Sequence, residues 1–430
     1  MIKVLVFPCG SEIALEIFRA LQYEKHIELW GGSSVSSNHG KFLFKNYIEG
    51  IPFVNRENFI PELDKTLKKY GIEYIFPAMD SVLLELSKNQ GRLFSKVVGS
   101  PYETNSVCIS KLKTYRLFKG KVLVPEVYGL EDLSDGFAGF PVFLKPESGY
   151  GSRGTYIAGS RGDVSFYLEQ APSLLILEYL PGKEYTVECF TDYKGRLRFV
   201  GGRERLRIQN GIAVHSRPVD HPGFATMAEV INNHLTFRGT WFFQLKENAA
   251  GEPVLMEIAP RAAGTAALNR NKGINLPLLS LYDAQGSDVD IIENNCKLEI
   301  DRALTNRFKI DCNYKYVYVD FDDCVIIKNK INTLLMMFLY QCINENKTIV
   351  LLSKHKGKED LENQLKTFRI DHLFDEIIHL SPEDSKADYI KRFPAIFIDD
   401  SFGERRSVFK TTGIPVFDLS SIEGLIDWRF

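Results

Sequence analysis

The sequence predicts an α/β and α+β multidomain protein, and three observations support this fold class. The chain has 430 residues, and at roughly 150 residues per domain this length is typical of two to four domains. Strand-like runs alternate with helical patterns near both ends, as in parallel or mixed sheets. In the middle region, the strands are linked by glycine-rich turns and several pair as hairpins. We therefore expect three domains, namely residues 1–100, 101–312 and 313–430.

The first hundred residues show a strand, a covering helix and a further strand. Ile13, Ile17 and Leu21 share one helical face, as expected for a helix that covers a sheet. A second helix is expected to stop at Gly71. The predicted strands are Lys3–Phe7, Ile27–Trp30 and Tyr74–Pro77, and the predicted helices are Glu12–Leu21 and Glu57–Tyr70.

The rest of the chain changes character twice. The middle region is expected to hold the strands Pro141–Lys145, Leu174–Tyr179, Tyr185–Thr191 and Leu197–Gly201. Near residue 312 the alternation of strands and helices returns. The strands expected there are Tyr316–Asp320, Thr348–Ser353, Ala395–Asp399 and Ile414–Asp418, with helices at Asn332–Glu345 and Asp360–Phe368.

Composition excludes several function classes. Hydrophobic residues make up 44% and charged residues 25%, the usage of globular proteins. The 53 basic residues balance 55 acidic ones, so no global basic field exists to hold nucleic acid or an anionic membrane. Seven scattered cysteines without a C-x-x-C pair argue against a disulfide framework and structural zinc. The most apolar segment, Leu334–Leu339, is far below the roughly 20 residues that span a bilayer. We expect a cytoplasmic protein without nucleic-acid or membrane partners. A homodimer is expected only because it is the commonest oligomeric state.

A glycine-rich loop follows the strand that ends at Lys145. Gly149, Gly151 and Gly154 lack the Cβ that would keep backbone N–H groups away from phosphate oxygens, and Lys145 adds a positive charge. The spacing is neither that of a Walker A loop nor that of a Rossmann fingerprint. Taken alone, the loop also fits a plain hairpin turn, and Lys111 upstream also fits a solvated helix lysine.

Acidic residues flank the next crossover and the two strands after it. Glu178 ends one strand and Glu184 enters the next, so this crossover, with Leu180, can offer a backbone edge to an adenine and a carboxylate to ribose hydroxyls. Gln244 and Glu257 lie on two later strands and are expected to face each other as oxygen ligands of Mg²⁺. Two protein oxygens suit Mg²⁺, which takes its other ligands from nucleotide phosphates.

These residues occur in the order found in the ATP-grasp superfamily, which residues 1 to about 310 resemble. The arrangement is similar to that of the carbamoyl-phosphate synthase large subunit and related carboxylate–amine ligases. The order is Lys111, Lys145 with its loop, Glu178, Glu184, Gln244, Glu257 and Arg261. The resemblance implies a Rossmann-like first domain followed by an ATP-grasp fold.

The resemblance also implies chemistry by phosphoryl transfer. MgATP would phosphorylate a small-molecule carboxylate, and an amine would attack the acyl phosphate; Mn²⁺ is an alternative metal. Arg261 and either Arg203 or Arg205 are candidates to hold the acyl phosphate, although for Arg203 a solvated strand edge is the favoured interpretation. The family's metal motif E-x-N-P-R has Ala259 at the Asn position here, which removes one oxygen ligand.

A second set of acidic residues lies in the last third of the chain. Asp320 and Asp322 follow an apolar strand and are expected on the same side as the chain leaves it. Asp399 and Asp400 repeat the arrangement after another strand. Because like charges this close repel unless a cation intervenes, the pattern predicts Mg²⁺. A capping or turn cluster is the alternative.

This last third resembles the haloacid dehalogenase (HAD) phosphohydrolase superfamily without a cap domain. The resemblance implies Asp320 as aspartyl nucleophile and metal ligand, and Asp322 as general acid/base. It also implies that Ser353 holds the phosphate, Lys386 balances charge, and Asp399 and Asp400 hold the metal. The family pattern D-x-D-G-[TV] has Asp323 and Cys324 at its last two positions here.

Our leading hypothesis is a bifunctional enzyme, an ATP-dependent, ADP-forming carboxylate–amine ligase fused to a phosphatase. One alternative is a ligase whose HAD domain is a non-catalytic module. Another is a nucleotide-binding regulator in which Ala259 marks lost catalysis. The histidines without metal-binding spacing are expected at the surface or in the core, namely His215, His221, His234, His355, His372 and His379.

Overall fold

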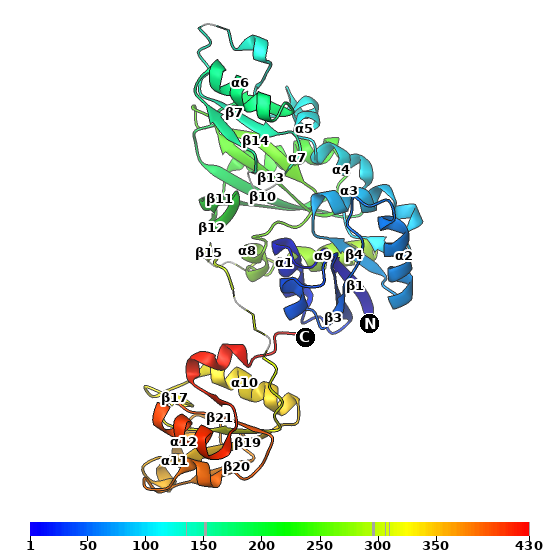
Figure 1. Cartoon of the computed structure of the whole chain (residues 1–430). Helices are drawn as coiled ribbons and strands as arrows, with labels where there is room; N and C mark the ends of the chain where they lie inside the picture. Colours follow the sequence, from blue (N-terminus) through cyan, green and yellow to red (C-terminus); the bar gives the residue numbers. More distant parts are fainter. Residues whose placement is uncertain (135, 150–152, 295–296, 306, 309, 430) are drawn as a thin grey trace. The chain divides into compact units, whose positions relative to one another are not determined.

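The computed structural model describes residues 1–134, 136–149, 153–294, 297–305, 307–308 and 310–429 (Figure 1). It divides into two compact units, Met1–Leu304 (unit 1) and Thr305–Arg429 (unit 2). The predicted boundary at residue 312 falls inside unit 2, because Cys312 and Tyr314 pack against the core of that unit. Whether unit 1 comprises two domains that meet near residue 100 stays a prediction.

Unit 1 begins with a parallel five-stranded sheet in the order β3-β2-β1-β4-β5. Its strands are β1 (Ile2–Phe7), β2 (Ile27–Gly32), β3 (Asn46–Ile48), β4 (Tyr74–Pro77) and β5 (Lys96–Val97), and its helices are α1 (Glu12–Leu21), α2 (Phe59–Tyr70) and α3 (Asp80–Lys88). Helix α1 has its predicted bounds and begins after Ser11, whose side chain accepts a hydrogen bond from the amide of Ala14. Helix α2 ends at Gly71, where a φ of 64° favours glycine.

An antiparallel four-stranded sheet follows, in the order β6-β9-β7-β8. Its strands are β6 (Val127–Tyr128), β7 (Val142–Pro146), β8 (Tyr156–Ala158) and β9 (Leu174–Glu178), and helix α6 (Arg161–Gln170) packs beside β8. Helices α4 (Tyr102–Cys108) and α5 (Lys111–Phe118) precede it. Val142, Leu144 and Val164 are fully buried, so the alternating apolar residues of β7 form one side of a small core with α6.

The largest sheet of unit 1 has six antiparallel strands in the order β14-β13-β10-β11-β12-β15. Its strands are β10 (Glu184–Thr191), β11 (Leu197–Gln209), β12 (Ile212–Pro218), β13 (Gly239–Glu247), β14 (Pro253–Ala259) and β15 (Ile300–Asp301), and helices α7 (Pro222–His234), α8 (Ala267–Asn271) and α9 (Leu276–Ala284) accompany them. Consecutive strands pair as the predicted hairpins. Strand β11 runs beyond its predicted end at Gly201, because the charged residues that follow pair with β12.

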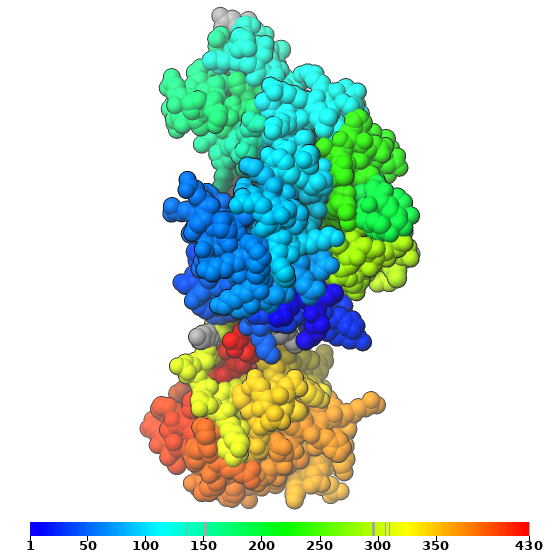
Figure 2. All heavy atoms as spheres, turned by 90° about the vertical axis from the view of Figure 1, so that its right-hand side faces the viewer, coloured from blue at the N-terminus to red at the C-terminus, as the bar shows by residue number. Residues whose placement is uncertain are grey.

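Figure 2 shows residues 1–100 (blue) and the cyan and green segments of unit 1 packed into one continuous body. Within this body, the six-stranded sheet has its own core of buried aromatic side chains. Trp241 is fully buried on β13, and its ring stacks on Phe237 at a centroid distance of 4.0 Å. Every helix among the described residues is too short or too polar to cross a lipid bilayer.

Unit 2 is built on a parallel five-stranded sheet in the order β20-β19-β16-β21-β22. Its strands are β16 (Tyr316–Val319), β19 (Thr348–Ser353), β20 (Glu376–His379), β21 (Ala395–Ile398) and β22 (Val416–Phe417). Helices α10 (Thr333–Asn344), α11 (Lys358–Thr367) and α12 (Phe402–Thr412) connect them, and a short hairpin joins β17 (Ile326–Ile327) to β18 (Lys330–Ile331). The central strand β16 lies between β19 and β21, so acidic residues that follow β16 and β21 leave the sheet at the same edge.

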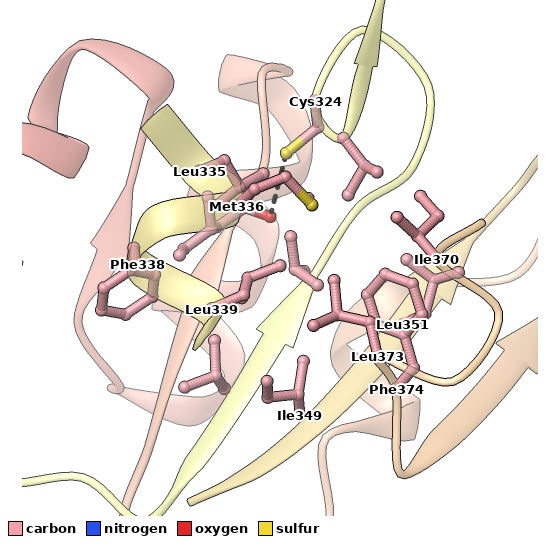
Figure 3. Close-up of a cluster of buried hydrophobic side chains, with 14 of the residues drawn as sticks. Cys324, Leu335, Met336, Phe338, Leu339, Ile349, Leu351, Ile370, Leu373 and Phe374 are labelled. Atoms are coloured by element: carbon pink, nitrogen blue, oxygen red, sulfur yellow. Dashed lines mark hydrogen bonds between the residues drawn. The ribbon is translucent and has the colours of Figure 1, made fainter. Parts of the chain in front are cut away.

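Figure 3 shows part of the apolar core of unit 2, which includes residues of α10 and β19. Leu335 and Leu339 of α10 pack against Ile349 and Leu351 of β19, and all four are fully buried. The thiol of Cys324, just after the first acidic residues, points at the carbonyl of Ile398 at a sulfur–oxygen distance of 3.9 Å (Figure 3). The segment after β16 is thereby tied to the end of β21.

Candidate functional site

A cavity of about 1370 Å³ in unit 1 collects most of the residues that the sequence singled out. Its walls come from the four-stranded sheet, the six-stranded sheet, and the loops and helices α1 and α3 that follow strands β1 and β4 of the five-stranded sheet. The predicted residues in its lining are Lys111, Lys145, Gly149, Glu178, Leu180, Glu184, Arg203, Arg205, Gln244, Glu257 and Arg261. Gly154 does not line the cavity, and Gly151 lies outside the described residues.

Two buried lysines enter this cavity. Lys111 begins α5 directly after Ser110, whose side chain accepts from the amide of Lys113 at 3.1 Å. Lys111 Nζ donates to the carbonyl of Gly149 at 3.4 Å, and the Lys111 side chain is buried. The interpretation of Lys111 as a solvated helix lysine is therefore wrong. Lys145 Nζ donates to the carbonyl of Met256 at 3.4 Å. Burial lowers the pKa of Lys145 to about 7, and the charge of Lys111 acts in the same direction.

The antiparallel register of β10, β13 and β14 sets the floor of the cavity. Thr186 pairs with Gln244 in register, and Gln244 pairs with Glu257, so the two expected Mg²⁺ ligands lie opposite each other as predicted. Phe242 pairs with Ala259 two positions further along. An amide oxygen and a carboxylate on neighbouring strands form a donor set that suits a hard cation.

Arg205 connects the predicted ribose and metal residues. Its Nη1 donates to Glu184 Oε2 at 3.0 Å and to Gln244 Oε1 at 2.9 Å. Lys246 Nζ donates to the other oxygen of Glu184, Oε1, at 2.9 Å. Sequence reasoning missed Lys246, although it lies two residues after Gln244 on the same strand and alternation places both on one face. Two cations therefore hold the Glu184 carboxylate in place.

Arg203 serves a different purpose from Arg205. Its Nη1 donates to Glu188, and Asn269 Nδ2 donates to the same carboxylate oxygen at 2.6 Å. The side chains of Arg203 and Glu188 are 3% and 1% exposed, so the interpretation of Arg203 as a solvated strand edge is wrong. Glu188 lies on the neighbouring strand β10. Without this carboxylate, the buried charge of Arg203 would lower the free energy of unfolding by roughly several kcal/mol. This pair anchors the segment around Asn269 beneath the cavity.

Arg261 is held by Asp80, the first residue of helix α3. Its Nε donates to Asp80 Oδ1 at 2.6 Å and its Nη2 to Asp80 Oδ2 at 2.9 Å. Asp80 is the first residue of α3, directly after the loop that follows β4. Burial disfavours the charged guanidinium, but the Asp80 carboxylate outweighs this effect and raises the pKa of Arg261. The arginine therefore stays protonated in the cavity.

In unit 2, three carboxylates converge at the edge of the parallel sheet. Oxygens of Asp320, Asp399 and Asp400 lie within 4.8 Å of one another, which is the predicted metal-binding set. Lys386 Nζ lies 2.7 Å from Asp320 Oδ1 and 2.7 Å from Asp399 Oδ2. Burial raises the pKa of Asp320 to about 7; Lys386 opposes this change and the Asp399 carboxylate adds to it. The three carboxylates exceed the one positive charge of Lys386, which is an arrangement that suits a bound cation.

Asp322 lies outside this group of three and has a partner that the sequence did not suggest. His355 Nδ1 lies 2.8 Å from Asp322 Oδ1, and His355 Nε2 lies 2.7 Å from Asp360 Oδ2. Although burial opposes the charged imidazole, these hydrogen bonds raise the pKa of His355. His355, which the sequence assigned to the surface or core, thus bridges two carboxylates. Its position two residues after Ser353 was the available signal.

Three further observations complete the site of unit 2. Ser353 is fully buried at the end of β19, and its Oγ accepts from the amide of His355 at 3.0 Å. Arg405 Nη1 donates to the carbonyls of Asp399 and Asp400 at 2.6 and 2.7 Å, so it fixes the backbone between these two acids. Asp323 has a φ of 51°, the left-handed region where the HAD pattern has glycine and where aspartate is tolerated.

Comparisons with known proteins agree with the fold of unit 1. Residues 170–304 match the family model "ATP-grasp in the biosynthetic pathway with Ter operon". A D-alanine–D-alanine ligase from Thermotoga sp. (strain RQ2) is 28% identical over 180 residues, which are 40% of this chain and 57% of that ligase. The chain thus spans a little over half the length of the curated relatives it matches.

Solved structures with similar folds are carboxylases and ligases. The biotin carboxylase domain of 2-oxoglutarate carboxylase from Hydrogenobacter thermophilus, crystallised with MgADP and bicarbonate, has a TM-score of 0.57 at 16% identity, over 68% of this chain and 71% of that one. The L-amino acid ligase from Bacillus licheniformis has a TM-score of 0.53 at 15% identity, over 66% and 74%. The predicted ATP-grasp fold is confirmed, and the HAD-like assignment of unit 2 stays a prediction.

Proposed function

We propose that unit 1 is an ATP-dependent, ADP-forming ligase that joins a small-molecule carboxylate to an amine through an acyl phosphate. The observation that carries the proposal is the single cavity in which two buried lysines, an oxygen pair and Arg261 meet. Ligand pockets commonly measure about 300–1000 Å³, so a cavity of about 1370 Å³ has room for ATP and two further substrates. The ligases among the similar proteins support this reaction class.

The lining residues fit ATP from one end to the other. The backbone edge near Leu180 suits the adenine, and the Glu184 carboxylate can accept from ribose hydroxyls. Lys111 and Lys145 would neutralise the phosphates, and protonated Lys145 would be favoured once the phosphates arrive. Gln244 and Glu257 would hold Mg²⁺, or Mn²⁺, with the phosphates as further ligands. Because Ala259 offers no side-chain oxygen, we propose one metal ion with two protein ligands.

The proposed reaction has two steps. A carboxylate oxygen attacks the γ-phosphorus, the bond to the β–γ bridging oxygen breaks, and ADP leaves. The amine nitrogen then attacks the acyl carbon, loses its proton, and expels inorganic phosphate. Arg205 and Arg261 would stabilise the negative charge that moves onto the acyl phosphate, which is where fixed cations lower the barrier most.

We propose that unit 2 is a Mg²⁺-dependent phosphohydrolase of the HAD type, and the converging carboxylates support this. Asp320 would attack phosphorus and form an aspartyl phosphate, and Asp322 would protonate the leaving group and later activate water. Ser353 and Lys386 would hold the phosphate. Mg²⁺ bound by Asp320, Asp399 and Asp400 would screen the charges of nucleophile and phosphate. The non-catalytic alternative predicts no turnover of phosphate esters by the intact protein.

We propose further that the two units catalyse related steps. A ligase that joins an acid to a phosphorylated amine could be followed by removal of that phosphate. The order would be contradicted if the Asp320→Asn protein gave the same final product as the wild type, with no phosphorylated intermediate.

The ligase is tested by ADP release from the Asp320→Asn protein with MgATP, against pooled carboxylates crossed with pooled amines. The variant keeps unit 2 from consuming phosphorylated substrates or products. ADP that forms only when one acid and one amine are both present establishes the reaction and names the substrates. If no substrate pair releases ADP although ATP binds, the result favours the alternative of a nucleotide-binding regulator. The Ala259→Asn variant then shows whether the missing oxygen ligand is the cause.

A further inference from the structure

Asp80 connects the first sheet of unit 1 to the proposed catalytic arginine. It follows β4 at the carboxyl edge of the sheet, where open α/β sheets bind ligands. Its carboxylate contacts Arg261, which lies 181 residues later in the chain. We propose that Asp80 is a positioning residue, which fixes the Arg261 guanidinium so that its remaining N–H groups donate hydrogen bonds to the acyl phosphate. This inference rests on the proposed ligase activity of unit 1.

The hydrogen bonds of Arg261 leave a defined part of the guanidinium available. Nε and Nη2 each donate to one oxygen of Asp80, and Nη1 donates to the carbonyl of Ala262 at 3.1 Å. A guanidinium carries five N–H groups, one on Nε and two on each terminal nitrogen. One N–H on Nη1 and one on Nη2 therefore remain for a ligand. Two such donors match two oxygens of a phosphate.

Packing restricts the arginine to this orientation. The guanidinium lies over the ring of Phe242 at 5.3 Å from its centroid, and the Arg261 side chain is 14% exposed. Phe242 is on β13, Asp80 on α3 and Ala262 just after β14, so three segments hold the group. A fixed cation needs no reorganisation when charge develops, whereas a mobile one does. Removing Asp80 should therefore affect the charged intermediate more than nucleotide binding.

A purely structural tether is the alternative, and the chain offers a matched control. Arg270 Nε donates to Glu16 Oε1 at 2.8 Å, which also ties the first sheet's helix α1 to the segment after β14. The Glu16 side chain is 2% exposed, and neither residue lines the cavity. If Asp80 only tethers, Asp80→Asn and Glu16→Gln should have similar consequences.

The experiment compares the full-length wild type with Asp80→Asn, Asp80→Glu and Glu16→Gln. Calorimetry first measures the affinity for MgADP, then the affinity of the MgADP complex for inorganic phosphate, which probes the Arg261 N–H groups. We expect Asp80→Asn to keep MgADP affinity within about twofold and to weaken phosphate binding at least about tenfold. Asp80→Glu should recover part of this loss, and Glu16→Gln should change neither affinity.

Turnover gives a second readout once the substrates are known. Asp80→Asn should lower kcat about a hundredfold at a nearly unchanged KM for ATP, as expected for a misplaced catalytic group. Unchanged phosphate affinity in Asp80→Asn, with a melting temperature lowered as in Glu16→Gln, would reduce Asp80 to a tether and overturn the inference. Failure of the wild type to bind MgADP would instead overturn the proposed function, and the inference with it.

Discussion

The two units distribute acidic and basic side chains differently around their sites. In unit 2, oxygens of Asp320, Asp399 and Asp400 lie close together, and the ammonium group of Lys386 contacts Asp320 and Asp399. In unit 1, by contrast, cations outnumber carboxylates in the lining of the cavity, and Glu184 contacts two of them, Lys246 and Arg205. Three carboxylates against one lysine leave a formal charge of about −2, which one divalent cation neutralises.

The difference indicates where each site obtains its positive charge. The three carboxylates of unit 2 carry more negative charge than Lys386 offsets, and the pKa of Asp320 is raised by burial and, in addition, by the Asp399 carboxylate. The lining of the unit 1 cavity already holds more cations than carboxylates, so it can attract an incoming triphosphate, which would bring its own metal ion. The proposed phosphohydrolase should therefore bind Mg²⁺ alone, whereas the proposed ligase should bind it together with nucleotide.

The largest expected effect is on the proposed nucleophile of unit 2. Asp320→Asn should lower hydrolysis of p-nitrophenyl phosphate by about a thousandfold or more, because no aspartyl phosphate can form. The release of p-nitrophenol measures this. Asp371→Asn, which lies outside the cluster, should hydrolyse the ester at the wild-type rate. If Asp320→Asn kept even a tenth of the activity, Asp320 would not be the nucleophile.

The next effect concerns the buried lysine of unit 1. Lys145→Ala should weaken MgATP binding by about tenfold to a hundredfold, as expected for the loss of a charged donor to phosphate. Calorimetry measures the dissociation constant. Lys113, an exposed neighbour of Lys111 on α5, provides the control variant Lys113→Ala. Equal affinities of the two variants would place the phosphates away from Lys145.

An effect of similar size is expected at Arg405, which holds the backbone of the two proposed metal ligands Asp399 and Asp400. Arg405→Ala should weaken Mg²⁺ binding to unit 2 by about tenfold to a hundredfold, the range found for residues that orient metal ligands. Titration of the Asp320-dependent hydrolysis with Mg²⁺ gives the half-saturating concentration, and calorimetry without substrate gives the affinity. Arg406→Ala on the same helix removes an exposed arginine and should change neither value.

The smallest effect is a pH dependence of nucleotide binding. The pKa of Lys145 is about 7 in the free protein, and bound phosphates favour its charged form. Above pH 7 binding must therefore take up a proton, so the affinity for MgADP should fall as pH rises from 7.5 to 9, by up to about tenfold per unit. Lys145→Arg stays charged throughout this range and should show a flat profile. A wild-type profile as flat as that of Lys145→Arg would contradict the lowered pKa.

Strand patterns in the sequence were sufficient to predict part of both sites. Gln244 and Glu257 could be paired because a hairpin joins two strands with alternating side chains. The resemblance to the HAD superfamily grouped Asp320 with Asp399, and the two residues do follow neighbouring parallel strands. Both predictions depend on whether neighbouring strands run parallel or antiparallel. A short connection indicates an antiparallel pair, and a long crossover indicates a parallel one.

Most of the contacts that sequence reasoning missed join residues far apart in the chain. Arg261 and Asp80 lie 181 residues apart, so only the folded chain shows that they meet. Arg203 was assigned to solvent because alternating charged residues along β11 are typical of an exposed edge, and its burial depends on Glu188 and Asn269. His355 lacked a metal-binding spacing, and its two carboxylate partners come from different segments.

The central claim is that the chain carries two chemically independent sites, and one crossed measurement tests it most directly. MgADP binding and p-nitrophenyl phosphate hydrolysis are measured for the full-length wild type, Lys145→Ala and Asp320→Asn. We expect Lys145→Ala to lose nucleotide affinity while its hydrolysis stays within about twofold of the wild type, and Asp320→Asn to show the reverse. Loss of both functions in either variant, or hydrolysis that depends on Lys145 and not on Asp320, would contradict the claim.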